Sequence, residues 1–65
     1  MKPEKMYSVL NVMSSQVDLL MSDLSEMTWI NEEERKRCVV ELEKAYVHLD
    51  NVALKILGEY DLGNV

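Results

Sequence analysis

The sequence contains few of the residues that break helices or cross-link small folds. Its 65 residues include one proline, two glycines, one cysteine and one histidine. A lone cysteine excludes a disulfide within the chain. One cysteine and one histidine are too few for a structural zinc site, which needs four ligands. We therefore expect no metal and no cofactor, and we expect a partner chain to supply stability, because small folds without such cross-links usually need one.

The sequence also lacks long hydrophobic runs and an excess of positive charge. The formal net charge is −5 at pH 7, which disfavours general binding to nucleic acid. Apolar runs reach only three or four residues, far too short to span a membrane. Three of the first five residues are charged, and the segment does not resemble the apolar part of a signal peptide. Together with the unpaired cysteine, this pattern predicts a cytoplasmic protein.

A regular heptad pattern occupies the first half of the chain. Pro3 suits the first turn of a helix, and no further proline or glycine occurs before Gly58. The apolar residues that follow are spaced alternately by four and three, as in a helix packed against another helix. This first seam consists of Met6, Leu10, Met13, Val17, Leu20, Leu24 and Met27. The pattern predicts a helix over residues 3–28.

A second helix is predicted over residues 32–57. Asn31 can cap it, Glu34 lies at the capping-box position, and the acidic residues 32–34 face the positive end of the helix dipole. Gly58 is a suitable stop, and we expect the tail 58–65 to fray. The alternative is a longer helix, since Tyr60 continues the heptad. The second seam consists of Val39, Leu42, Tyr46, Leu49, Ala53 and Ile56. A parallel row of Cys38, Ala45 and Val52 widens this apolar face.

These elements predict an all-α fold in a single domain, residues 1–65. A connection as short as residues 29–31 makes the two helices antiparallel neighbours in a hairpin. The wide face on the second helix is typical of a helix with two neighbours. The hairpin supplies one neighbour, so we expect a second chain to supply the other. The predicted assembly is a dimeric four-helix bundle whose core is formed by the two seams.

Some apolar residues lie off the seams. Val40, Val47 and Leu54 are one heptad apart on the second helix, while Val12 and Leu19 lie on the first. They are either scattered surface residues, which are common, or a docking stripe for a partner.

The first helix is rich in methionine, with Met6, Met13, Met21 and Met27. These side chains either fill the interior of the bundle or form a groove that exchanges partners, since methionine packs adaptably. The methionine-rich face is therefore the alternative to the stripe as the partner surface.

Trp29 lies in the predicted connection. With Ile30 it is expected to close the end of the bundle. The alternative is an exposed anchor for binding, because tryptophan is enriched in interface hot spots.

No constellation of residues predicts an enzyme. Cys38 is expected to be a small buried apolar residue, with a reactive thiol or an intermolecular disulfide as alternatives. His48 lies on the polar face without a second histidine or cysteine nearby, so no metal pair forms. Arg35, Lys36 and Arg37 are the only basic cluster, and they directly follow three glutamates. We interpret them as an exposed first turn with internal ion pairs, or as a small contact for phosphate.

The outline resembles the Rop-type RNA-binding regulators of plasmid copy number, which are helical hairpins that dimerise into four-helix bundles. The likeness consists of length, two heptad helices, a short turn and an acidic tail. The family binds RNA through basic and polar residues of its first helix, where this chain has Lys2 and Lys5 at the start and Asn11, Ser15 and Asp18 farther on. Small helical-hairpin co-chaperones of type III secretion have a similar outline.

The sequence therefore favours a small non-enzymatic interaction module, acting as an adaptor, regulator or co-chaperone. Its expected partner is a second copy of itself, with a different helical protein as the alternative. A nucleic-acid regulator that uses Arg35, Lys36, Arg37 and the N-terminal lysines is the second hypothesis.

Overall fold

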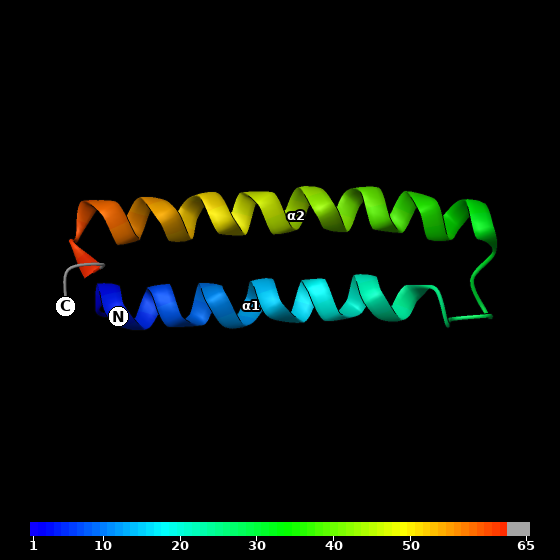
Figure 1. Ribbon diagram of the computed structural model, residues 1–65, viewed down its shortest axis with the longest axis horizontal. Helices are drawn as coiled ribbons and strands as arrows, with labels where there is room; N and C mark the ends of the chain where they lie inside the picture. Colours follow the sequence, from blue (N-terminus) through cyan, green and yellow to red (C-terminus); the bar gives the residue numbers. More distant parts are fainter. Residues whose placement is uncertain (63–65) are drawn as a thin grey trace.

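The computed structural model describes residues 1–62 of the chain. It consists of two helices, α1 (Pro3–Leu24) and α2 (Glu32–Glu59), and no strand occurs in the described part. The helices run side by side in opposite directions, so the N-terminus lies near the end of α2 (Figure 1). The prediction of an all-α antiparallel hairpin is confirmed. The last three residues of the expected tail lie outside the described part.

α1 begins at Pro3, as predicted, but ends four residues before the expected residue 28. Its last turn contains no basic residue, and Asp23 places a carboxylate near the negative end of the helix dipole. The Ser25 hydroxyl donates to the carbonyl oxygen of Ser22 at 3.3 Å. Serine side chains that bond to the backbone compete with helix propagation. The connection is therefore longer than predicted and includes residues 25–31.

α2 begins at Glu32, as predicted. The Asn31 side chain accepts a hydrogen bond from the backbone N–H of Glu34 at 2.9 Å, which satisfies one of the donors left free at a helix start. All three residues of the first turn are acidic and complement the helix dipole. The side chains of Glu32 and Lys36 also lie 3.7 Å apart in an exposed ion pair.

Arg35 ties the connection to the first turn of α2. Its guanidinium donates to the carbonyl oxygen of Met27 at 3.0 Å and to that of Ile30 at 3.1 Å. The Met27 carbonyl oxygen also accepts from the N–H of Ile30 at 3.3 Å, so the arginine adds a second donor there and a donor to the carbonyl oxygen of Ile30. Arg35, the first residue of the predicted basic cluster, therefore lies in α2 and stabilises the connection with its side chain.

The prediction that Gly58 ends the second helix is wrong. α2 continues through Gly58 to Glu59, and the N–H of Tyr60 still donates to the carbonyl oxygen of Ile56 at 3.1 Å. The chain turns at Asp61, whose φ of 59° is left-handed. Aspartate tolerates this conformation better than most residues.

The core between the helices is thin. Leu10, Leu24 and Ala53 are the buried hydrophobic residues of the described chain, joined by the buried hydroxyl of Ser14. No large side chain among residues 1–62 is fully buried. A two-layer structure of this kind has little interior, because each helix covers only one side of the other.

α1 faces α2 with only part of its predicted seam. Leu10 and Leu24 are buried and Val17 is half-buried, but Met6, Met13 and Leu20 are 37%, 43% and 44% exposed. The other side of the inter-helix contact is formed by Tyr7, Ser14 and Met21. Both sets lie at heptad spacing on either side of the row formed by Leu10, Val17 and Leu24. The hairpin packs the second set against α2. The methionine-rich half of the seam is therefore left uncovered.

Candidate interaction surface

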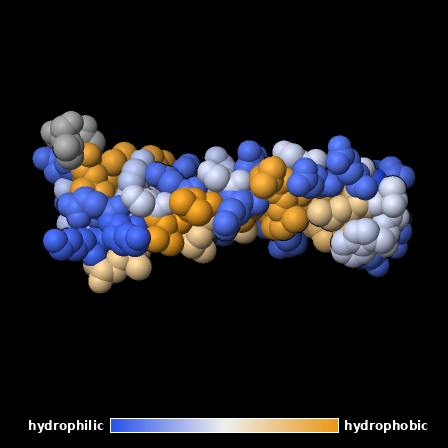
Figure 2. Space-filling view, turned by 90° about the horizontal axis from the view of Figure 1, so that it is seen from below, coloured by the Kyte–Doolittle hydropathy of each residue, from blue (hydrophilic) through white to orange (hydrophobic). Residues whose placement is uncertain are grey.

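An apolar row runs along one flank of α1 from end to end. It consists of Met6, Met13 and Leu20, each more than a third exposed, and is continued by the half-buried Met27 in the connection. Seven-residue spacing holds these side chains on one side of the helix. Figure 2, seen from the side of α1, shows hydrophobic surface recurring along the length of the molecule. A single hairpin does not bury this row.

A matching row lies on α2, and its first residue, Cys38, borders an apolar groove between the helices. Leu20 and Leu24 of α1 line an apolar surface groove together with Cys38 and Leu42 of α2. The groove therefore fixes which flank of α2 lies on the same side as the methionine row. Cys38 is exposed, Ala45 is half-buried and Val52 is 40% exposed. We call the combined surface the open face, and it consists of Met6, Met13, Leu20 and Met27 with Cys38, Ala45 and Val52.

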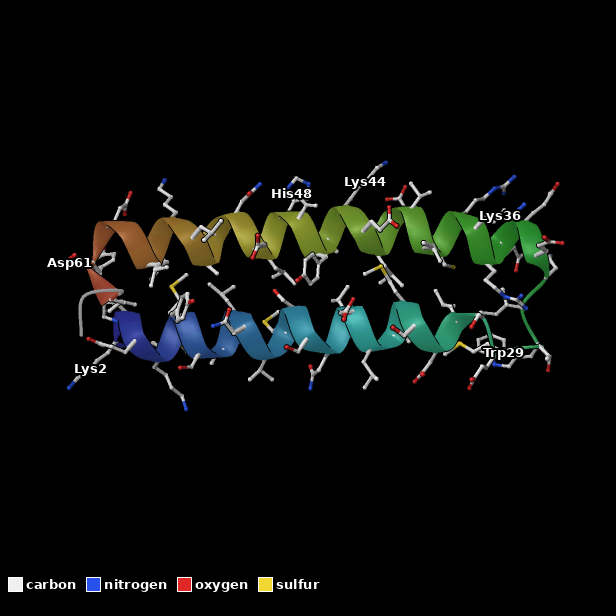
Figure 3. The ribbon with its side chains drawn as sticks, viewed as in Figure 1. Lys2, Trp29, Lys36, Lys44, His48 and Asp61 are labelled. Carbon is white, nitrogen blue, oxygen red and sulfur yellow. The ribbon has the colours of Figure 1, made fainter. Side chains whose placement is uncertain are left out.

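Two predictions about single residues are wrong for the hairpin. Cys38 was expected to be buried, yet it is exposed at the groove. Trp29 was expected to close the end of the bundle, yet it is 80% exposed and borders the same groove beside Ile30 (Figure 3). Both predictions assumed that two neighbouring helices surround α2, and the hairpin supplies one. Trp29 lies where an exposed binding anchor would lie.

The second seam is covered more completely than the first. Val39, Leu42, Leu49 and Ile56 are half-buried and Ala53 is buried against α1. Tyr46, by contrast, lies at the edge and is 36% exposed. The small side chain of Ala53 permits close approach of the helices.

The predicted docking stripe lies on the outer side of α2. Val40, Val47 and Leu54 are 48%, 52% and 56% exposed. Val40 and Val47 line a shallow groove with Glu43, Lys44 and His48. Lys44 and His48 project away from α1 (Figure 3). This surface alternates apolar and charged groups, whereas the groove on the open face is lined almost entirely by apolar atoms.

The basic residues of the nucleic-acid hypothesis are not brought together. Arg35 is held in the connection, while Lys36 pairs with a glutamate. Lys2 lies at the opposite end of a molecule 45 Å long, as Figure 3 shows. Lys5 follows Lys2 in the first turn of α1. No continuous basic surface joins these positions.

The described residues were also compared with what a metal site or a membrane-spanning helix requires. His48 is exposed on α2, as predicted. Within residues 1–62 no three histidine, cysteine or acidic side chains come together in a way that would hold a metal ion. Neither α1 nor α2 is both long and apolar enough to cross a membrane.

The chain was compared with protein families, curated proteins and solved structures. No protein-family model, no curated protein and no solved structure matches the chain.

Proposed function

We propose that this chain is a non-enzymatic protein-interaction module that self-associates through its open face into a dimeric four-helix bundle. The observation that carries the proposal is the uncovered apolar groove shared by both helices. In this assembly the open face of each hairpin becomes the interior of the bundle. The outer stripe of Val40, Val47 and Leu54 then remains available to a different protein, as expected of an adaptor, regulator or co-chaperone.

The surface area of the hairpin supports this proposal. The chain exposes 5117 Å² of accessible surface. A compact monomer of 7.5 kDa exposes about 4,200 Å² on the scaling observed for folded monomeric proteins. The excess, about 900 Å², is close to the area of about 800 Å² that each partner buries in a standard protein interface. The excess accessible surface of the hairpin thus supports the burial of one interface of standard size by a partner.

The shape supports it in the same way. The Cα radius of gyration is 14.7 Å. A compact domain of this length has a radius of gyration of about 11 Å. A hairpin with three buried hydrophobic residues has little hydrophobic stabilisation of its own. An assembly of two hairpins packed on their open faces has a lower ratio of length to width than one hairpin. It also has four helices around its core in place of two.

The nucleic-acid hypothesis has less support. It requires a basic surface, and the net charge is −5. Arg35 donates to two backbone carbonyls, which occupies the first residue of the cluster. The N-terminal lysines lie at the other end of the hairpin. The basic residues of this hypothesis therefore do not form one patch.

Two adjacent leucines on α1 provide a matched test. Leu20 belongs to the open face and is 44% exposed, whereas Leu19 points outward and is 62% exposed. Leu20→Lys places a charge in the proposed interface, and Leu19→Lys places the same charge in solvent. Light scattering should give twice the chain mass for the parent and for Leu19→Lys, and the chain mass for Leu20→Lys at the same concentration. A parent that has the mass of one chain, or a Leu20→Lys variant that stays dimeric, would contradict the proposal.

A further inference from the structure

We infer that the occupant of the open face is a second copy of this chain, packed so that the connection of one hairpin lies at the terminal end of the other. We call this arrangement the opposite-end dimer. The inference rests on the proposed self-association and adds its orientation. The broad side of the hairpin measures 45 by 18 Å, or about 800 Å², which is the area that one partner contributes to a standard interface.

Two arrangements with twofold symmetry can bury the same face. In the opposite-end dimer the twofold axis crosses the hairpin, and α1 packs on α1 and α2 on α2 of the second copy. In the same-end dimer the axis runs along the hairpin, and α1 packs on α2 of the second copy. Both satisfy the self-complementary requirement of a twofold interface. The choice depends on which side chains meet.

The apolar row of α2 is symmetric about its middle. Cys38 and Val52 lie seven residues on either side of Ala45. When α2 packs on a reversed copy of itself, Ala45 therefore meets Ala45 and Cys38 meets Val52. Met13 and Leu20 of α1 exchange places in the same way. Leu20 of α1 and Leu42 of α2 border one groove, and each lies three to four residues from the middle of the row on its helix. The centres of the two rows therefore lie at nearly the same level along the hairpin.

The charges beside the row are also complementary when reversed. Glu41 borders the groove, and the residues one heptad apart from it share its side of α2. These residues are Glu34, Glu41, His48 and Lys55. Reversal about the middle of this row places Glu34 beside Lys55 and Glu41 beside His48. Each acidic group then meets a group that carries an N–H donor.

The same-end dimer pairs these charges badly. On α1 the row outside the methionines contains Lys2 at one end and Asp23 at the other, beside the connection. In the same-end dimer α1 runs antiparallel to α2 of the second copy, and Asp23 lies next to Glu41. Like charges at the rim of an interface disfavour an arrangement even where opposite charges add little affinity. The exposed ion pairs that Glu41 and Lys55 form within the chain are weak and do not prevent new partners.

Cysteine cross-linking separates the two arrangements. The double variant Cys38→Ala/Ala45→Cys carries its thiol at the twofold axis of the opposite-end dimer. Under an oxidised-glutathione buffer it should form a covalent dimer on a non-reducing gel. The matched control Cys38→Ala/Val47→Cys carries its thiol on the outer stripe and should stay uncross-linked.

A second variant uses the native thiol. In the opposite-end dimer the two Cys38 residues are offset by fourteen residues, or about 21 Å along the helices. A disulfide spans at most about 7 Å between Cα atoms, so the parent chain should not cross-link. Val52→Cys in the chain that retains Cys38 should cross-link, because the two positions meet.

The outcomes distinguish the inference from the proposal beneath it. The mass of each reduced variant is measured first by light scattering. If these variants are dimeric but neither the Ala45→Cys nor the Val52→Cys chain cross-links, the opposite-end arrangement is wrong and self-association stands. If the reduced parent has the mass of one chain, the proposed function fails as well.

Discussion

The guanidinium of Arg35 donates to the carbonyl oxygen of Met27 at 3.0 Å, across eight residues of sequence. This bond and the one to Ile30 connect the start of α2 to the non-helical connection of residues 25–31. The Nε of the same side chain is buried without a hydrogen-bond partner. The guanidinium is therefore partly desolvated where it makes these two hydrogen bonds. The short connection of the hairpin is thus held by a side chain from the following helix.

Arg35→Met should lower the free energy of unfolding by about 2 kcal/mol, because two carbonyl oxygens lose a charged donor. Methionine retains the length and the helix propensity of the side chain, which leaves the hydrogen bonds as the main difference. Urea unfolding followed by circular dichroism measures the change. Arg37→Met, two residues away on an exposed position, is the control and should change stability by less than about 0.5 kcal/mol. Equal effects of the two substitutions would contradict a role of Arg35 in the turn.

Asn31→Ala should cost about 1 kcal/mol, because the N–H of Glu34 loses its acceptor. Asn31→Asp retains an acceptor oxygen and should leave stability nearly unchanged. Asn51→Ala, within the exposed part of α2, should be neutral or slightly stabilising, since alanine is the better helix former. Thermal unfolding of the three variants separates the cap from the effect of losing an amide. A cap role is excluded if Asn31→Ala and Asn31→Asp lose the same stability.

Ser14→Ala should stabilise the protein by about 1 kcal/mol. The hydroxyl is buried and has no hydrogen-bond partner, so its removal relieves a desolvation cost and raises helix propensity. Ser15→Ala, on the exposed neighbour, should show the smaller gain from propensity alone. Ser14→Leu should instead destabilise, by about 1–3 kcal/mol, because the helices are close at this position. A loss of stability in Ser14→Ala would mean that the hydroxyl makes a favourable interaction.

Leu49→Asp should abolish assembly and most of the helicity, because Leu49 lies in the seam between the helices. Val47→Asp introduces the same charge two residues away on the outer stripe, where the side chain is 52% exposed. It should retain both helicity and mass. Circular dichroism and light scattering on the two variants test the seam and the stripe together. A Leu49→Asp variant that stays helical and dimeric would show that the seam is misassigned.

The features that depend on local chemistry could be predicted from the sequence. The start of α2 follows from an asparagine cap and acidic residues that act within one turn. The hairpin follows from heptad spacing and a short connection. The early end of α1 was missed because the heptad of apolar residues continues through Met27, while the local serines and Asp23 favour a stop.

The rotation of α1 could not be predicted from spacing alone. The row of Met6, Met13 and Leu20 and the row of Tyr7, Ser14 and Met21 both flank Leu10 at heptad positions. Apolar character favours the first row, and the hairpin buries the second. The first row includes Met6 and Met13 of the methionine-rich face, which is an alternative prediction for the partner surface, but spacing alone does not show that this row stays uncovered. The exposure of Cys38 was not predicted for the same reason, since Cys38 borders that face. The exposure of Trp29 agrees with the alternative given for that residue.

Thermal unfolding at different chain concentrations tests most directly whether the hairpin depends on a second copy for its stability, as self-association through the open face implies. The midpoint is measured by circular dichroism over a hundredfold dilution series. For a folded dimer in equilibrium with unfolded chains, the midpoint should fall by about 10 °C across the series, by mass action and the usual unfolding enthalpy per residue. A midpoint that does not change with concentration, in a chain that unfolds cooperatively, would show that the hairpin is stable alone and would contradict the account.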